Sequence, residues 1–519
     1  MQQKGSIFDE FIPYLLIAVF SFGYIFLFGT WFFRDFSIIF DGGLRVWYGQ
    51  VPYRDFFIPT GPVIYYLQGL INSILEPGRI ALLLHASVIN TLALILFFRH
   101  SRKYVDVILC AGFTILLHFF YHARLVNPWY DQTALLFYFA AQVVVFPYFD
   151  KSRPISIKTL TLISFFCLLS IFSKQDIGTI GSVFIAGQLI GYSRRSFRNL
   201  GLFVLILTSQ VLLVVLLFNS STDFSYWFNY GQPPHSSRAD LIFSKVLSDT
   251  WLLQDFRLHT VVLGAVFVIV TRDYSQLTVK NYLFVGGLSV FSILISITSG
   301  QGKYSSLFFI PLIAVHLLKL IFENKFVKLD PRKGILISYL LGWVVIGYMT
   351  TKIFANLFPV WLTINKGYTP LQNSSYAGYK LEPKLIQGIE QLKGVLQKGK
   401  DKDKDKGSTD WFLNMSSYTF LYKDLNIEPP RGMHLYYHSG VTVFEKDYLD
   451  LKVKLEKRKF RYILLQEMAT GFPSGEEFVA YLRQLGYREL LAVDTPKSGV
   501  NGEGRGSRFQ ATLYELQEH

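Results

Sequence analysis

Carboxylate and ammonium groups stand at the ends of several long apolar segments of this chain, where they could act together on an anionic substrate. Asp35 follows the first segment and Asp131 opens another, while Lys174 lies in a very short turn and Lys303 just precedes a further segment. Charged groups near the membrane interior are costly, so each is a functional candidate. Carboxylates and cations at matching ends predict a pocket for an anionic group.

Other polar residues in the same connections could belong to this pocket. Arg124 is a further candidate for holding a phosphate, or it could snorkel to the membrane interface. Asp55 is either a site residue near an acceptor or the partner of Arg54 or Arg45 in a loop ion pair. His235, in the sequence GQPPHSSRAD, could serve an acceptor or a metal.

Simpler roles are open for the main candidates. Asp is a favoured residue at helix N-caps, so Asp35 and Asp131 could each cap a helix. Lys174 could pair with Asp176 at the level of the lipid headgroups. The spacing of these residues alone does not separate such roles from catalysis.

The elements that must position these residues are predicted to span a membrane. Of the 519 residues, 51% are hydrophobic and only 17% are charged, whereas about a quarter are charged in a typical soluble protein. An apolar block of roughly 18 or more residues can cross a bilayer, and about eleven candidate spans are present, some of them short. They lie at about 11–31, 79–98, 104–120, 131–149, 159–173, 177–192, 199–219, 259–271, 281–298, 305–322 and 335–358.

Basic residues predict the orientation of these spans, because short cytoplasmic loops are rich in Lys and Arg. The net charge of +14 does not indicate nucleic acid, since the basic residues fall in short loops between apolar blocks. With the N-terminus in the cytoplasm, the short outer loops hold only Arg124, Lys174 and Lys303. The inner segments hold sixteen basic residues: Lys4, Arg99, Arg102, Lys103, Lys151, Arg153, Lys158, Arg194, Arg195, Arg198, Arg272, Lys280, Lys325, Lys328, Arg332 and Lys333. The C-terminus is then expected outside.

The predicted fold is a polytopic α-helical membrane domain over residues 1–358, followed by an extracytoplasmic α/β domain over residues 359–519. The stretch KGKDKDKDKGS at 398–408 predicts a solvated loop. Strand-like segments and one helical pattern follow it. The strands are predicted at Trp411–Leu413, Tyr462–Leu465 and Thr512–Leu516, and the helix at Gly475–Leu485.

The first outer loop, residues 32–78, contains a predicted amphipathic helix at 36–48. Apolar residues recur there at helical spacing and form one face, while Asp41 and Arg45 share another face. Such a helix is expected to rest on the membrane surface.

The charges at the outer ends would suit the transfer of a sugar from a lipid phosphate. A carboxylate would take the proton of the acceptor as the sugar carbon becomes oxocarbenium-like. Lys or Arg would stabilise the phosphate leaving group, most effectively where water is excluded. A lipid carrier would also explain why the chemistry takes place in a membrane-embedded protein.

The segment RDFSIIFDGGLRVWYGQVPYRDFFIPTGPVIYYLQGL, residues 34–70, resembles the first outer loop of the GT-C superfamily of membrane glycosyltransferases. More narrowly, it is similar to bacterial relatives of protein O-mannosyltransferases and of the lipid A aminoarabinose transferase. The resemblance implies that Asp35 is the catalytic carboxylate. Many members have an Asp-Glu pair there, whereas this chain has Asp35-Phe36, which weakens any inference of a metal bound by the second acid. A divalent metal ion stays open as a cofactor.

Three further segments resemble the same superfamily in the same order. HARLVNPWYDQTALL resembles a second acidic site, which implies that Asp131 is a further catalytic residue that would orient the acceptor or a metal. FSKQDIG resembles a short Lys-containing turn, which implies that Lys174 would bind the donor phosphate. GQGKYSSLFFIPLIAV matches a segment associated with lipid-phosphate binding, which maps to Lys303 and Tyr304.

The resulting expectation is an inverting glycosyltransferase in the bacterial inner membrane. Its donor would be a polyprenyl-phosphate-linked sugar, its acceptor a glycan, a lipid or a protein, and nucleic acid would not be a partner. The alternatives are a transporter or lipid-linked-sugar flippase and a noncatalytic scaffold on the same fold. A transporter predicts broken helices near the bilayer midplane and inverted repeats, and the sequence shows neither clearly.

Overall fold

The computed structural model describes most of the helical core and of the C-terminal region. The described residues are 7–30, 36–58, 60–122, 126–151, 155–192, 196–219, 264, 279–298, 308–323, 343, 346–347, 350–351, 367–402, 411–437, 445–458, 460–466, 475–493 and 511–517. The chain divides into two compact units. Unit 1 comprises Met1–Ile25, Ala86–Leu217 and Arg238–Phe358, and unit 2 comprises Phe26–His85, Phe218–Ser237 and Pro359–His519.

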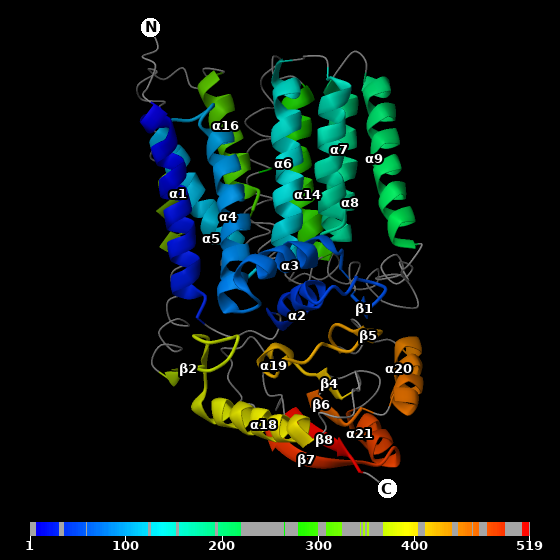
Figure 1. The fold of residues 1–519 in the computed structure, drawn as a ribbon. Helices are drawn as coiled ribbons and strands as arrows, with labels where there is room; N and C mark the ends of the chain where they lie inside the picture. The colour runs from blue at the N-terminus through cyan, green and yellow to red at the C-terminus, as the bar shows by residue number, and fades with distance from the viewer. Residues whose placement is uncertain are drawn as a thin grey trace, which may run out of the picture. The chain divides into compact units, whose positions relative to one another are not determined.

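Long apolar helices occupy the predicted membrane spans (Figure 1). They are α1 (Ile7–Phe28), α4 (Arg79–Ser101), α5 (Val107–His122), α6 (Tyr130–Lys151), α7 (Ile157–Ile171), α8 (Gln175–Tyr192), α9 (Ser196–Asn219), α14 (Val279–Thr298) and α16 (Ile310–Glu323). Each coincides with a predicted span. The predicted spans at 259–271 and 335–358 lie almost wholly outside the described residues.

Three of the described helices are both long and apolar enough to cross a bilayer: Phe11–Phe28, Arg79–Ser101 and Phe197–Phe218. Only 6% of the residues of the last span are buried within the protein, so most of its apolar side chains keep surface that can face lipid. A helix that satisfies its own backbone hydrogen bonds and exposes apolar side chains is suited to a hydrocarbon environment. The chain is therefore a multi-pass membrane protein.

Polar side chains link the helices inside unit 1. Asn90 Nδ2 donates to Ser21 Oγ at 2.6 Å and lies 2.7 Å from His118 Nδ1. His100 and His316 approach each other at 3.0 Å between their Nε2 atoms. Buried polar pairs of this kind hold helices together where the hydrophobic effect between them is weak.

The first outer loop belongs to unit 2 and contains α2 (Phe36–Trp47), β1 (Phe56–Phe57) and α3 (Val63–Leu75). The two helices pack closely because glycines face large side chains across the contact. A Cβ at Gly42 would lie 2.0 Å from Tyr65 Cδ1, and one at Gly43 would lie 2.2 Å from Gln68 Cγ. Side chains at these positions would force the helices apart.

The helix predicted at 36–48 is confirmed as α2, but its expected place on the membrane surface is wrong. Every residue from Phe36 to Arg45 is buried within the protein. The polar face does not point to water, because Asp41 and Arg45 form a buried ion pair at 3.0 Å.

The C-terminal part of unit 2 contains a four-stranded sheet. The strands are β4 (Phe412–Met415), β6 (Tyr462–Gln466), β7 (Tyr487–Val493) and β8 (Ala511–Leu516), in the order β4-β6-β8-β7. The β4–β6 pair is parallel and the other two pairs are antiparallel. The described residues of this part also form four helices and three short strands. The helices are α18 (Pro383–Lys402), α19 (Phe420–Asp424), α20 (Glu445–Arg458) and α21 (Gly475–Gln484), and the strands are β2 (Thr369–Pro370), β3 (Lys380–Leu381) and β5 (Met433–His434).

The core of this part joins the sheet to two helices. Leu413 and Ile463 from the sheet pack with Leu451 of α20 and Phe478 of α21. The predicted strands at 411–413, 462–465 and 512–516 and the helix at 475–485 correspond to β4, β6, β8 and α21. The charged stretch 398–408 is not a loop throughout, because its first five residues, up to Lys402, belong to helix α18. The compact units follow contacts rather than continuous sequence, so the predicted domain boundary at residue 358 stays a prediction.

Candidate active site

Lys174 forms the centre of a buried ion-pair cluster in unit 1. Its Nζ lies 2.8 Å from Asp131 Oδ1 and 3.5 Å from Asp176 Oδ2. The side chains of Lys174 and Asp131 are 9% and 4% exposed. The same ammonium lies 5.5 Å from the centre of the Tyr130 ring, a cation–π distance. The structure therefore brings together two of the residues predicted for the site, Asp131 and Lys174.

Three helix ends position this cluster. Asp131 lies in the first turn of α6, Asp176 lies in the first turn of α8, and Lys174 lies in the turn between α7 and α8. The backbones of α7 and α8 approach closely at this turn. Only glycine fits at position 178, because a Cβ there would fall 2.2 Å from the backbone nitrogen of Ile171. The helix dipole favours negative charge at helix N-termini, so the two carboxylates and the ammonium have matching positions at these helix ends.

The cluster could handle an anionic group through Lys174. A Lys ammonium is a compact charge on a flexible stem, so it can turn towards a ligand while a carboxylate steadies it. Removal of either carboxylate would leave the buried cation less compensated. Asp176, which the sequence places two residues from Lys174 among the charged residues at the outer span ends, adds a second carboxylate to the cluster.

Asp55 lies in unit 2 and is held by several donors. Its Oδ2 accepts from the Val51 amide at 2.8 Å and from Arg54 Nη2 at 2.6 Å, and its Oδ1 lies 3.8 Å from Arg431 Nη1. Burial tends to raise the pKa of Asp55, but these hydrogen bonds and the two guanidinium charges outweigh burial and hold the pKa below its ordinary value. The loop ion pair with Arg54 is thus present, and a role towards an acceptor stays a prediction.

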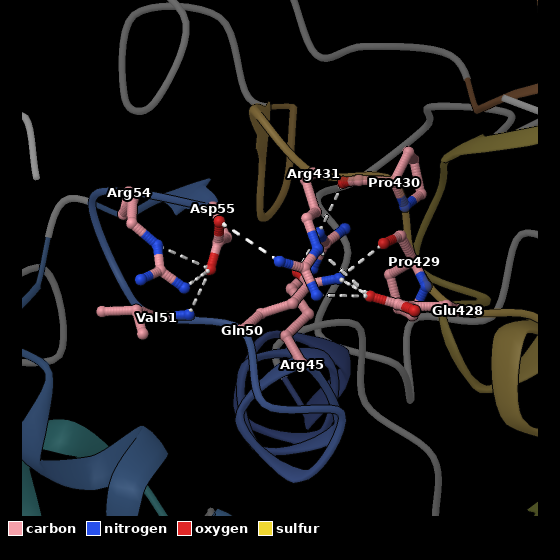
Figure 2. A network of polar contacts seen from close by, with 9 residues as sticks. All are labelled: Arg45, Gln50, Val51, Arg54, Asp55, Glu428, Pro429, Pro430 and Arg431. Atoms are coloured by element: carbon pink, nitrogen blue, oxygen red, sulfur yellow. Dashed lines mark hydrogen bonds and ion pairs between the residues drawn. The ribbon is translucent and has the colours of Figure 1, made fainter. Parts of the chain in front are cut away.

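Arg45 and Gln50 join the first outer loop to a C-terminal segment, residues 428–435 (Figure 2). Arg45 Nη1 donates to the Pro430 carbonyl at 2.9 Å, and Gln50 Nε2 donates to the Pro429 carbonyl at 2.6 Å. In addition, β1 pairs in parallel with β5. We call this contact the loop junction, and it comprises Arg45, Gln50, Asp55 and residues 428–435. The sequence does not indicate it, because its partners are about 380 residues apart.

A metal site is not formed by the residues that the structure describes. Among them no group of three or more His, Cys, Asp or Glu side chains is arranged to hold a metal ion. Asp131 and Asp176 do not fit a divalent cation as they stand, because the Lys174 ammonium already lies within 4 Å of both carboxylates.

The other predicted site residues are Asp35, Arg124, His235, Lys303 and Tyr304, and all five lie outside the described residues. Asp35 immediately precedes α2, which begins at Phe36. Their predicted roles stay predictions.

Similarity to known proteins is visible in structure and not in sequence. No protein-family model matches the chain, and no curated protein matches it significantly. ArnT from Cupriavidus metallidurans bound to undecaprenyl phosphate is similar at 10% identity and a TM-score of 0.50, over 98% of this chain and 98% of that one. The apo state of the same protein is similar at 11% identity and a TM-score of 0.50, over 98% and 97%.

The oligosaccharyltransferase of Archaeoglobus fulgidus, tethered with an acceptor peptide, aligns less well. The identity is 11% and the TM-score is 0.47, over 89% of this chain and 70% of that one. The chain has the helical fold of ArnT, a GT-C glycosyltransferase, and the resemblance predicted from the sequence is confirmed at the level of the fold.

Proposed function

We propose that the protein is an inverting glycosyltransferase that takes a sugar from a polyprenyl-phosphate donor and passes it to an acceptor outside the cytoplasm. The observation that carries this proposal is the buried Lys174 ammonium beside Asp131 at 2.8 Å. The second support is the fold, shared over 98% of the chain with a protein that was solved bound to undecaprenyl phosphate.

In the proposed reaction, Asp35 accepts the proton of an acceptor hydroxyl group. The acceptor oxygen forms a bond to the anomeric carbon of the sugar while the bond from that carbon to the phosphate oxygen breaks. The polyprenyl phosphate leaves with an added negative charge. Direct displacement from the opposite face inverts the configuration at the anomeric carbon.

Cations would stabilise the charge that develops on the leaving phosphate. Lys174 is proposed to contact this phosphate, with Lys303, Tyr304 and Arg124 as further ligands. An ammonium that is 9% exposed acts in a largely dry environment, where it stabilises a developing anion more strongly than it would in water. Asp131 is proposed to hold this ammonium in place, in addition to its predicted role in orienting the acceptor.

The proposed location is the bacterial inner membrane, with the N-terminus in the cytoplasm and the C-terminus outside it. The excess of Lys and Arg in the predicted inner segments supports this orientation. The acceptor is a glycan, a lipid or a protein, and Asp55 and His235 are proposed to lie near its path.

The experiment that tests the function compares Asp35→Asn with the wild type in cells that depend on the chain for its product. Cell-envelope glycans and lipid-linked sugars are analysed by mass spectrometry. We expect the product to fall at least about 100-fold in the variant, as is typical for loss of a general base, while the lipid-linked donor accumulates.

The control variant is Asp106→Asn, which removes a carboxylate that caps α5 by accepting from the Ile108 amide at 2.9 Å. It should leave the product unchanged. Wild-type levels of product from Asp35→Asn, at equal amounts of inserted protein, would overturn the catalytic assignment.

A further inference from the structure

A pair of aromatic residues, Trp129 and Tyr130, directly precedes Asp131 where α6 begins. Their ring centroids lie 4.1 Å apart, with the ring planes inclined by 34°. Trp129 is only 4% exposed, whereas Tyr130 is half-buried. Neighbouring aromatic rings attract each other beyond the effect of the area that they bury. The buried Trp129 ring therefore restricts the position of the Tyr130 ring.

The Tyr130 ring is a partner of Lys174 that differs in kind from the two carboxylates. Asp131 and Asp176 lie 2.8 Å and 3.5 Å from the ammonium, and the centre of the ring lies 5.5 Å from it. Each carboxylate attracts the ammonium but repels an anion that approaches the same ammonium. An aromatic ring attracts a cation through its quadrupole and carries no net charge. The ring can therefore hold the ammonium without repelling an anionic ligand.

From this arrangement, we infer that Tyr130 is a positioning residue, whose ring holds the Lys174 ammonium while that ammonium binds the phosphate of the donor. The inference rests on the proposed function, in which Lys174 contacts this phosphate. The ammonium has three N–H donors, so phosphate oxygens can replace a carboxylate as the acceptor for some of them. The contact with the Tyr130 ring persists in the bound state, because the phosphate does not repel a neutral ring.

The surroundings of Lys174 strengthen the contact with the ring. The side chain of Lys174 is 9% exposed, and a cation–π contact is stronger where the cation has lost its water. Without the ring, the ammonium would depend more on Asp131, and a phosphate would have to displace that carboxylate in order to bind. Loss of the ring is therefore expected to weaken the binding of a lipid phosphate.

A second contact between a lysine and a tyrosine in unit 1 provides a matched control. Lys319 Nζ lies 4.7 Å from the centre of the Tyr104 ring and 5.5 Å from that of the Phe146 ring. Phe146 lies sixteen residues after Tyr130 on the same helix, which is about 24 Å at a rise of about 1.5 Å per residue. Loss of the Tyr104 ring should therefore affect stability without affecting a lipid that is bound at Lys174.

The test measures the binding of undecaprenyl phosphate to the purified full-length chain by native mass spectrometry, which detects the bound lipid directly. The variants are Tyr130→Phe, Tyr130→Leu, and chains with mono-, di- or trifluorophenylalanine at position 130. Fluorine withdraws electron density from the face of the ring and hardly changes its size, so it weakens a cation–π contact without opening a cavity. Tyr104→Leu is the control variant.

We expect Tyr130→Phe to bind undecaprenyl phosphate like the wild type, because it keeps the ring. Tyr130→Leu should bind between about threefold and thirtyfold more weakly. The affinity of the fluorinated chains should fall stepwise between those of these two variants, and Tyr104→Leu should bind like the wild type.

Equal affinity across the fluorinated chains would overturn the inference, and so would a loss in Tyr104→Leu as large as that in Tyr130→Leu. If Lys174→Gln weakens binding but Tyr130→Leu does not, only the role of Tyr130 is overturned. Absence of binding by the wild type would overturn the proposed function together with this inference.

Discussion

The Lys174 cluster and the loop junction are both built on buried cations, but they bind those cations differently. Arg45 is 2% exposed, and its planar guanidinium is fixed by Asp41, Gln50 and the Pro430 carbonyl. Lys174 is a point charge between two carboxylates at neighbouring helix ends. A rigid, multiply bonded Arg suits a structural joint, whereas a flexible Lys suits a charge that must meet a ligand. Burial of a cation alone therefore does not identify a site.

The largest effect on stability is expected from Arg45→Met. The change would leave Asp41 buried without its ion-pair partner, which typically costs about 3–5 kcal/mol. Thermal unfolding of the purified protein in detergent measures the loss. Arg54→Met is the matched control, since its side chain is 41% exposed and a surface pair contributes below about 1 kcal/mol. Similar melting temperatures for the two variants would mean that Arg45 does not stabilise the loop junction, and the distinction from the Lys174 cluster would fail.

Lys174→Gln should have the next largest effect, and on activity. Loss of one electrostatic contact to a developing charge typically lowers the rate about 100- to 1000-fold. Product formation is measured alongside thermal unfolding, with Lys103→Gln as an exposed control. Lys174→Arg should retain part of the activity, because it keeps the charge. Full activity in Lys174→Gln would place this cluster with the loop junction as a structural feature.

The loop junction should also respond to acid through His434. Burial and the nearby charge of Lys454 lower the pKa of His434 to about 3. Because the unfolded His has a pKa near 6.5, its contribution to stability is complete above that pH and is lost as the pH falls from 6.5 towards 3. At pH 5 the loss is about 2 kcal/mol. The melting temperature of the wild type should therefore fall more between pH 7.5 and pH 5 than that of His434→Gln, and equal slopes would contradict this role.

The smallest effect on stability is expected from the titration of Asp55, and it should occur at a lower pH than that of His434. Its pKa is held below the ordinary value, so its contribution to stability is complete above a pH of about 4 and is lost as the pH falls through the pKa of the folded state. The difference in melting temperature between the wild type and Asp55→Asn should be present at pH 7 and shrink in strong acid. A difference that does not change with pH would mean that the charge of Asp55 is not what stabilises the loop.

Local patterns in the sequence predicted much of the fold. The apolar blocks located the described spans, and helical spacing located α2. The position of α2 was not predictable, because its polar pair is buried by packing between distant parts of the chain. Helix α3 was missed for a related reason. Its polar stripe, Gln68 and Asn72, faces inwards, and amphipathic patterns are ordinarily interpreted with the polar side in water.

The candidate site was predicted in part. The sequence placed Asp131 and Lys174 at matching helix ends, and the structure joins them at 2.8 Å. The hydrogen bond from Arg45 to the Pro430 carbonyl could not be predicted, since it joins residues that are 385 positions apart in the sequence. Contacts of that range depend on tertiary packing rather than on local spacing.

The most direct test of the central claim is the binding of undecaprenyl phosphate to the purified full-length chain and to Lys174→Gln. Thermal stabilisation by the lipid, titrated in detergent, gives the two affinities. We expect saturable binding by the wild type and at least about tenfold weaker binding by the variant, which corresponds to the loss of one charge-assisted contact of roughly 1.4 kcal/mol or more. No binding by the wild type, or equal binding by both proteins, would contradict it.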